Sequence, residues 1–454
     1  MQSSSCRGAI PKPAVAVLAA VAATLTVAVG IRNRLCPIDE PDPIGLAWLA
    51  PAPTVAYSIR PEVKSIRVGD WDGDGVRDVC VVLPSPRESS SRFQVVSAVS
   101  GQSIRCWDGI SLGVPSCGQS IAAIGDVNRD GLEDLALSYS NVGLLIVAGG
   151  TTNVLNRITD VGGTIYAIET LGDVDLDDVD DLALNIGWPE PKIQIRSSAS
   201  GLLLGEWAYE KLPHEVPSGC FAFTWAVCGV GDIDGDGVKD VAVGAPPGRP
   251  WDHPDFIPRK GFVEMRSGKD GHSIWRVHAR WEGEEWPTDL SPFADEDGDG
   301  IGDLLIGAKG RMEVASGRNG DLLLEREGPA GTDWGVRVED AGDWNADGQA
   351  DVLVFCTNEC TESGAPFGCG GTFEILSGFD GELLHKDRLT RHSYQGDAVP
   401  VGDVDADGYD DLVLTFPRTN QSDVDFPCCD AFRTPSSWVA LVSGAKALAA
   451  NKAD

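Results

Sequence analysis

Short apolar runs separated by turns recur along nearly the whole chain. The runs are rich in Val, Ile and Leu, and each is bounded by polar or turn-forming residues. They are too short and too β-branched for helices, so we expect each to be a buried strand. The runs are Val79–Leu83, Leu135–Leu137, Leu182–Leu184, Val241–Val243, Leu304–Ile306, Val352–Phe355 and Leu412–Leu414.

Other strands are expected on either side of each run. Approach strands precede it, for example Ser65–Val68, Ile121–Ile124 and Trp225–Val230. A third strand ends in a Ser-Gly or Gly-Gly turn, where Gly, Asn and Asp supply the positive φ of a hairpin. A fourth strand, such as Ile274–Val277, closes each unit. The third-strand segments are Phe93–Gly101, Leu144–Gly150, Ile193–Gly201, Phe262–Gly268, Met312–Gly317, Phe373–Gly378 and Trp438–Gly444.

An acidic loop joins the approach strand to the apolar run in every unit. Its clearest copy has Asp232, Asp234, Asp236 and Asp240 at positions 1, 3, 5 and 9 of a D-x-D-x-D-G-x-x-D pattern. Seven copies occur, and their first positions lie 47 to 63 residues apart by subtraction along the sequence. This spacing is close to that of a propeller blade, roughly 40–50 residues.

These loops predict metal sites. Carboxylates two residues apart on a tight turn converge on one point, and a hard cation offsets their repulsion. Ca²⁺ suits them because it takes about 6–8 oxygen ligands in flexible geometry. The turn needs a residue that tolerates positive φ, hence a glycine at position 6. We expect up to seven Ca²⁺ ions, held by positions 1, 3, 5, 7 and 9. The candidate ligands are Asp70, Asp72, Asp74, Val76, Asp78, Asp126, Asn128, Asp130, Leu132, Asp134, Asp173, Asp175, Asp177, Val179, Asp181, Asp232, Asp234, Asp236, Val238, Asp240, Asp295, Asp297, Asp299, Ile301, Asp303, Asp343, Asn345, Asp347, Gln349, Asp351, Asp403, Asp405, Asp407, Tyr409 and Asp411.

Three loops depart from the pattern. Asp178 stands where glycine is expected, which puts the geometry of that loop in doubt. Asn128 and Asn345 replace the aspartate at position 3, so those two sites lose a charge and are expected to be weaker.

Seven four-stranded antiparallel units predict an all-β fold, a seven-bladed β-propeller with a calcium loop in each blade. We expect Thr54–Arg60 to complete the last blade and lock the ring. In such a meander the first and third turns lie at one end of the blade. The metal loops therefore share one rim, and the long insertions converge on the opposite rim. Since loops on a rigid scaffold carry function, a ligand is expected there.

Charge excludes one class of partner. The chain has a formal net charge of −33 with 42% hydrophobic residues, so it is acidic without being a disordered tail. Much of the acid lies in the loops and is accounted for by metal binding. Nucleic acid is excluded as a partner because its phosphates would be repelled.

The N-terminus predicts export from the cytosol. Residues 1–30 resemble a secretory signal peptide, but the apolar run Ala14–Ile31 is also long enough to act as an uncleaved membrane anchor. Residues 31–53 are rich in Pro and Asp and are interpreted as a linker, followed by the propeller at 54–454. We expect a secreted, periplasmic or cell-surface protein, where extracellular calcium fills even weak loops.

Twelve cysteines fit the same compartment. Pairs close in sequence make local disulfides plausible, although their connectivity cannot be read from the sequence. Cys80 lies inside an apolar strand and is either paired or a buried thiol. The cysteines close in sequence are Cys106 and Cys117, Cys220 and Cys228, the trio Cys356, Cys360 and Cys369, and the adjacent Cys428 and Cys429.

The fourth unit carries a family resemblance. Its loop is followed by V-A-V-G-A-P, ending at Pro246, and is preceded by Phe223, so it resembles the FG-GAP repeats of the integrin α-subunit propeller. It is also similar to the related repeats of bacterial secreted and surface proteins, the FG-GAP/VCBS type. The resemblance spans about 54–448 and implies structural calcium loops with a ligand on the rim away from them.

The function expected is non-catalytic binding or adhesion, with an extracellular protein or glycan as partner. One alternative is a propeller lectin that binds carbohydrate, and a less favoured one is a hydrolase or lyase with a site in the central channel. The G-x-S-x-G pattern around Ser111 lies in a link between blades, whereas a nucleophile elbow needs a strand-to-helix turn, so it is attributed to chance.

Overall fold

The computed structural model describes most of the predicted propeller. Residues 44–422 and 434–454 form one compact unit, and residues 1–43 and 423–433 form a second unit that lies outside the described residues. The predicted signal peptide or anchor at 14–31 therefore also lies outside them. The described ranges are 46–51, 64–83, 91–114, 117–139, 143–151, 153–188, 192–208, 226–246, 260–356, 372–378, 380–388, 397–416 and 438–444.

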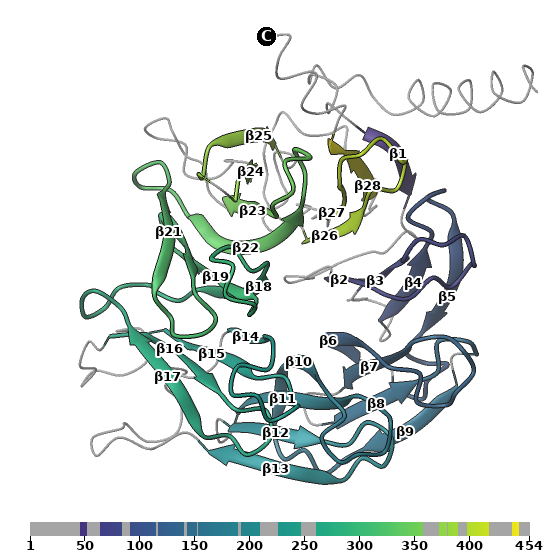
Figure 1. The fold of residues 1–454 in the computed structure, drawn as a ribbon. Helices are drawn as coiled ribbons and strands as arrows, with labels where there is room; N and C mark the ends of the chain where they lie inside the picture. The colour runs from purple at the N-terminus through teal and green to yellow at the C-terminus, as the bar shows by residue number, and fades with distance from the viewer. Residues whose placement is uncertain are drawn as a thin grey trace, which may run out of the picture. The chain divides into compact units, whose positions relative to one another are not determined.

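Seven four-stranded antiparallel sheets make up the described unit, as predicted (Figure 1). We number them as blades 1 to 7 in chain order. The first, innermost strands are β2 (Lys64–Arg67), β6 (Cys117–Ile124), β10 (Thr164–Gly172), β14 (Ala226–Gly229), β18 (Asp289–Phe293), β22 (Trp334–Gly342) and β26 (Asp397–Gly402). The second strands are β3 (Val79–Leu83), β7 (Asp134–Tyr139), β11 (Asp181–Trp188), β15 (Val241–Ala245), β19 (Asp303–Ala308), β23 (Asp351–Cys356) and β27 (Asp411–Phe416).

The remaining strands complete each meander outward. The third strands are β4 (Arg92–Val96), β8 (Gly143–Val147), β12 (Lys192–Arg196), β16 (Phe262–Arg266), β20 (Arg311–Ala315), β24 (Thr372–Leu376) and β28 (Trp438–Ser443). The outer strands are β5 (Ser103–Asp108), β9 (Val154–Ile158), β13 (Leu203–Ala208), β17 (Ser273–His278), β21 (Leu322–Glu327), β25 (Leu383–Arg388) and β1 (Leu46–Pro51).

The innermost strands form a closed ring. Each contacts the innermost strand of the next blade, in the order β2, β6, β10, β14, β18, β22 and β26, and β26 contacts β2 again. A ring of sheets leaves only short protected edges, which is how propellers avoid open-edge association. The sevenfold circular arrangement predicted from the repeat is thus confirmed.

Closure differs from the prediction in one respect. The strand that completes blade 7 is β1, which pairs antiparallel with β28. The predicted segment, Thr54–Arg60, lies outside the described residues, and the closing strand instead comes from the end of the stretch interpreted as a linker. Its sequence, LAWLAP, is an apolar strand rather than part of a Pro/Asp-rich segment. The N-terminal closure itself was predicted correctly.

The core lies between blades. Every residue of β15 and of β19 is buried, whereas the outer strands β17 and β21 have exposed positions. A middle strand is covered on both faces by neighbouring blades, which explains its continuous apolar run. One core cluster joins Phe93 of blade 1 to Leu135 and Leu145 of blade 2. Sheet packing between adjacent blades therefore accounts for the apolar pattern.

Two of the cysteines considered for local disulfides are unpaired. Cys106 and Cys228 are free thiols, so neither forms a disulfide with the cysteine close to it in sequence. Cys228 is buried in the apolar cluster of blade 4, where β14 directs it into the core. Cys80 is also a buried free thiol, and burial raises its pKa. The side chains of Cys428 and Cys429 lie outside the described residues.

Within the described ranges, no helix is long and apolar enough to cross a membrane.

Candidate metal centres

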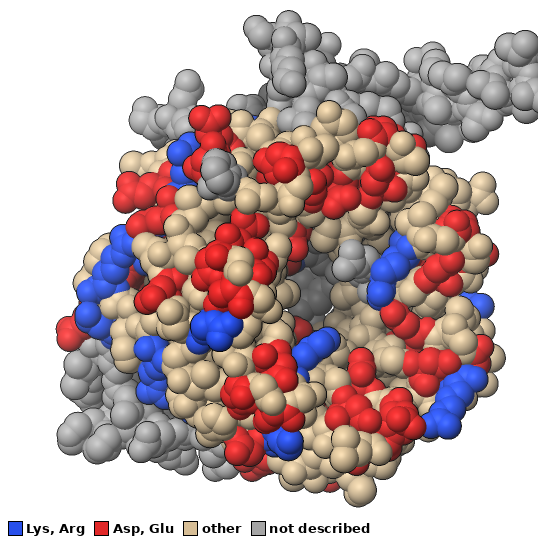
Figure 2. Space-filling model, viewed as in Figure 1, with Lys and Arg blue, Asp and Glu red and all other residues tan. Residues whose placement is uncertain are grey.

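Each acidic loop joins the first strand of a blade to the second. Asp232–Asp240, for example, connects β14 to β15. We call the end of the ring that carries these loops the loop rim; it also carries the third turns, such as 267–272 and 316–321. The opposite end, the link rim, carries the second turns and the links between blades, including 109–114, 159–163, 279–288 and 328–333. Figure 2 shows Asp and Glu gathered in separate patches around the central opening.

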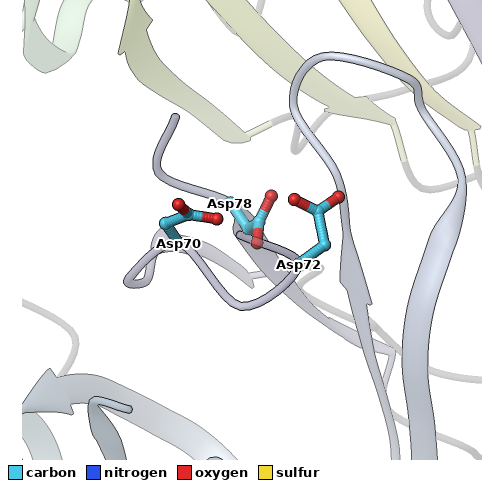
Figure 3. A group of neighbouring side chains, drawn as sticks. All are labelled: Asp70, Asp72 and Asp78. Carbon is cyan, nitrogen blue, oxygen red and sulfur yellow. The ribbon is translucent and has the colours of Figure 1, made fainter. Parts of the chain in front are cut away.

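The carboxylates within a loop converge. In blade 1, oxygens of Asp70, Asp72 and Asp78 lie within 4.8 Å of one another (Figure 3). Equivalent groups are Asp126, Asp130 and Asp134; Asp173, Asp175 and Asp181; Asp232, Asp234 and Asp240; and Asp295, Asp297 and Asp299, with one more group in the described part of the chain. Uncompensated acids repel one another, so this clustering suits a cation.

The loop backbone is left-handed at two positions. The sixth residue has positive φ in all seven loops, as the glycine pattern predicted, and Gly237 shows a φ of 91°. Asp178 adopts a φ of 68° at this position, so the loop without the glycine keeps the same turn. The fourth residue is left-handed as well, including Arg129 and Leu176, which the sequence analysis missed.

Hydrogen bonds explain why the first aspartate is needed for this turn. In blade 4, Asp236 N donates to Asp232 Oδ1 at 3.0 Å and Gly237 N donates to Asp232 Oδ2 at 2.8 Å. Both bonds recur in all seven loops. The first carboxylate therefore holds the turn around itself while its remaining lone pairs stay available.

The ninth aspartate links the loop to the third turn. Asp240 Oδ2 accepts a hydrogen bond from Ile233 N at 2.7 Å, and Asp240 Oδ1 accepts one from Gly268 N at 3.1 Å. The bond to position 2 occurs in every loop, and the bond to the third turn is present in blades 2 to 7. These seven carboxylates have no exposed surface.

Burial perturbs the ninth position. It raises the pKa of Asp78, Asp181 and Asp411 to about 6 and that of Asp351 to about 7. Desolvation disfavours the charged form, and the other loop acids add repulsion. A bound cation would stabilise the charged form of these carboxylates against both desolvation and repulsion. The loops are therefore better suited to bind a metal ion than to hold protons.

The third turn places different residues near the loops of blades 2, 4 and 5. Two residues after its serine, blade 5 has Arg318, which donates from Nε to Asp299 Oδ2 and from Nη2 to Asp299 O. In blade 4, Lys269 Nζ donates to Asp236 O at 3.1 Å. In blade 2, where Ala148 takes the place of the serine, the residue is Gly150, and a Cβ there would collide with Asp130 Oδ2. The sequence analysis identified these residues only as hairpin turns and missed their proximity to position 5.

The donor set fits a hard divalent cation. Positions 1, 3, 5 and 9 supply only carboxylate or amide oxygens, the ligands that Ca²⁺ prefers over the nitrogen and sulfur ligands of zinc. The backbone carbonyls of position 7 stay a prediction. Val76 N and its six counterparts donate to the carboxylate at position 5.

The G-x-S-x-G pattern has no catalytic geometry. Ser111 lies in the link between β5 and β6, so the required strand-to-helix elbow is missing. Its Oγ donates to Asp108 O at 2.6 Å and its N–H donates to Asp108 Oδ1 at 2.8 Å. Ser111 thus stabilises a local turn.

Comparison with known proteins supports the resemblance inferred from the sequence. The FG-GAP repeat family matches residues 223–254, which include the loop of blade 4. Integrin alpha pat-2 of Caenorhabditis elegans is 24% identical over 223 residues, covering 40% of this chain, and its Caenorhabditis briggsae counterpart is 26% identical over 214 residues, covering 39%. The chain spans 17% of the length of each relative.

Solved structures share the fold. A crystal structure of BBS1N in complex with ARL6DN, soaked with lead, has a TM-score of 0.52 at 11% identity and covers 88% of this chain and 97% of its own. A mercury-soaked crystal of the same complex gives 0.51 at 10% identity, with coverages of 87% and 96%. These structures show the fold alone: the chain is a seven-bladed propeller, it carries an FG-GAP repeat at 223–254, and it is similar to integrin α chains.

Proposed function

We propose that the protein is a calcium-stabilised propeller that acts outside the cytosol as a non-catalytic binding or adhesion module. The observation that carries this proposal is the hydrogen-bond pattern of the first and ninth carboxylates, which is the same in all seven loops, together with the converging carboxylates of six of them. An adhesion or binding role is in keeping with the similarity to integrin α chains and the FG-GAP match.

Calcium would act as an internal cross-link in each blade. Position 1 orders the loop, positions 3 and 5 add oxygen ligands, and position 9 connects the loop to the buried third turn. The cation supplies positive charge that allows these acids to remain ionised at neutral pH. Because the cages form only when the chain folds, binding would stabilise the folded state.

The partner would bind the link rim. The loop rim repeats one motif and offers little to distinguish partners, whereas the links differ in length and sequence from blade to blade. Links 109–114, 279–288 and 328–333 share no common motif. Variable loops on a rigid ring are a common basis for recognition. We infer an extracellular protein or glycan as the partner, and a secreted or surface location, in which residues 14–31 would serve as a signal or an anchor.

Thermal unfolding in calcium, magnesium and chelator tests the metal part of the proposal. Each site adds RT ln(1+[L]/Kd), about 2.7 kcal/mol at one hundred times Kd, so several sites should raise the midpoint by well over ten degrees. Magnesium should raise it less, because it demands closer octahedral geometry and sheds water reluctantly. An unfolding midpoint that is the same in calcium and in chelator would contradict the proposal that calcium bound in the acidic loops stabilises the fold.

Cell-surface labelling tests location and anchoring. An epitope tag at the C-terminus should be reached by antibody on intact cells or recovered from the medium. Recovery only from the cytosol would contradict the proposed location.

A further inference from the structure

One aromatic side chain stands out on the link rim. Trp281, in the link between β17 and β18, is 57% exposed. By contrast, Trp286 and Trp334 belong to core clusters and are almost completely buried. Burial of an indole would stabilise the fold, so an indole that stays exposed is a candidate contact for a ligand.

Buried charges hold the link in place beneath this indole. Glu284 is 6% exposed and accepts hydrogen bonds from Arg280 N at 2.7 Å and Trp281 N at 3.4 Å. Its other oxygen pairs with the guanidinium of Arg311, which is also buried, on β20. The backbone on either side of the indole is therefore fixed to the next blade.

A second carboxylate extends the network. Glu313 accepts hydrogen bonds from Trp286 Nε1 at 2.7 Å and from Arg311 Nε at 2.8 Å. Arg280 reaches Glu325 on β21 at 2.6 Å. Buried ion pairs are costly unless all their hydrogen bonds are made, and they favour one arrangement over others. The network thus fixes the backbone that carries Trp281, and a fixed backbone lowers the entropic cost of binding.

The charges around Trp281 restrict its ligand. The guanidinium carbon of Arg311 lies 6.0 Å from the centre of the indole ring, so one cation already interacts with it. Arg311 and Arg280 are themselves paired with Glu284, Glu313 and Glu325, so a second cation would have to compete with Arg311 for the indole face and with both arginines for these carboxylates. An anion would meet the exposed Glu282 and Glu285 in the same link. A neutral ligand with many hydroxyl groups avoids both conflicts, since carboxylates accept and guanidinium groups donate hydrogen bonds to it.

We propose that Trp281 and the charged groups around it form a binding site for a neutral carbohydrate, in which the C–H face of a pyranose ring stacks on the indole. This inference rests on the proposed function as a binding module and specifies the ligand class and its place on the link rim. Aromatic stacking supplies the apolar contact, and the charged side chains around the indole supply directional hydrogen bonds.

Titration calorimetry with four neutral hexasaccharides tests the site: cellohexaose, maltohexaose, mannohexaose and xylohexaose. The full chain in calcium should bind at least one, and Trp281→Ala should weaken that binding tenfold or more. Trp281→Phe should retain part of the affinity. Leu322→Ala, which removes another exposed apolar side chain on the outer strand β21, is the matched control and should bind as the unaltered protein does.

The outcomes separate this inference from the proposed function. Unaltered binding by Trp281→Ala would place the sugar elsewhere and overturn the site. Binding of none of the four sugars at millimolar concentration would overturn the carbohydrate assignment, while a calcium-dependent midpoint would leave the binding-module proposal standing. Capture of a sulfated glycan or a protein that depends on Trp281 would also overturn the neutral-sugar assignment.

Discussion

The two rims of the ring are built on different principles. On the loop rim one loop structure recurs seven times. Each loop has the same left-handed positions and the same hydrogen bonds from backbone N–H groups to its first carboxylate. The described links show no repeated motif, and their most elaborate feature, the network under Trp281, occurs in one link. Repetition allows each blade to be stabilised alike, whereas a single-copy network can distinguish one ligand from others. Under the proposed function, stability and recognition thus lie at opposite ends of the ring.

The largest expected contrast between the rims is in pH dependence. The raised pKa values of Asp78, Asp181, Asp351 and Asp411 belong to the loop rim. In chelator, the folded protein holds protons on these groups between about pH 4 and pH 7 that the unfolded chain has released. Their stabilising contribution is full below pH 3.8 and is lost as pH rises through about 6 to 7.

Unfolding in urea at pH 5 and pH 7.5 measures this effect. Without metal, stability should be greater at pH 5 by several kcal/mol, since one pKa unit corresponds to about 1.4 kcal/mol. High salt serves as the control, because it screens general repulsion at a net charge of −33 but affects buried groups less. Saturating calcium should remove or reverse the trend. Greater stability at pH 7.5 in chelator would contradict the interpretation of the ninth position.

Substitution of a single ninth aspartate should give the next largest effect. Asp351 accepts hydrogen bonds from Trp344 N, Asn345 N and Gly378 N. Asp351→Ala would leave three buried or partly buried donors unpaired at about 1–3 kcal/mol each, so a loss of roughly 3 kcal/mol or more is expected. On the link rim, Asp333 pairs with Lys309 at 3.0 Å near the surface. Asp333→Ala should cost less than about 1 kcal/mol. Equal losses in urea unfolding would erase the distinction between the rims.

A smaller effect should separate the loops from one another. Arg318 contacts Asp299 and lowers its pKa, mainly through a side-chain hydrogen bond, so it competes with a cation for that carboxylate. Arg318→Gln should raise the affinity of loop 5 several-fold. Equilibrium dialysis at low free calcium should then find up to one more ion bound per chain. Ala199→Arg, at the matching position of blade 3, should have the opposite effect. If neither substitution changes the bound calcium, the third turn does not tune the sites.

The sequence predicted the features that repeat. Asp232 and its counterparts predicted the loops, the number of blades and the rim that all the loops share. They could do so because a metal site requires the same residue types at the same spacing each time. The alternation of turns then followed from the meander. Even Asp178 proved compatible with the loop, since aspartate tolerates the left-handed region better than most residues.

Single-copy features were harder to predict. The closing strand β1 has no repeat partner, and prolines and acids beside it concealed the apolar run Leu46–Pro51. The link under Trp281 depends on Arg311 and Glu313 from another blade, a contact between segments that no local pattern marks. Arg318 was found as a turn residue, but only the fold brings it to Asp299.

The smallest expected effect concerns Leu176, at the fourth position of loop 3. It has a φ of 66° and is 86% exposed, whereas blades 1, 4 and 5 have glycine there. A left-handed residue other than glycine costs about 1–2 kcal/mol, and glycine's extra freedom in the unfolded chain offsets part of this. Leu176→Gly should therefore stabilise the metal-free protein by about 0.5–1 kcal/mol in urea unfolding.

Leu322→Gly is the matched control, because Leu322 is also an exposed leucine but lies in a strand, where glycine should destabilise. Opposite signs for the two substitutions would show that the loop rim is governed by backbone conformation. Destabilisation by Leu176→Gly would instead mean that the leucine side chain itself contributes to the fold. The loop rim would then contain a stabilising contact that occurs in one loop only, as the network under Trp281 occurs in one link only.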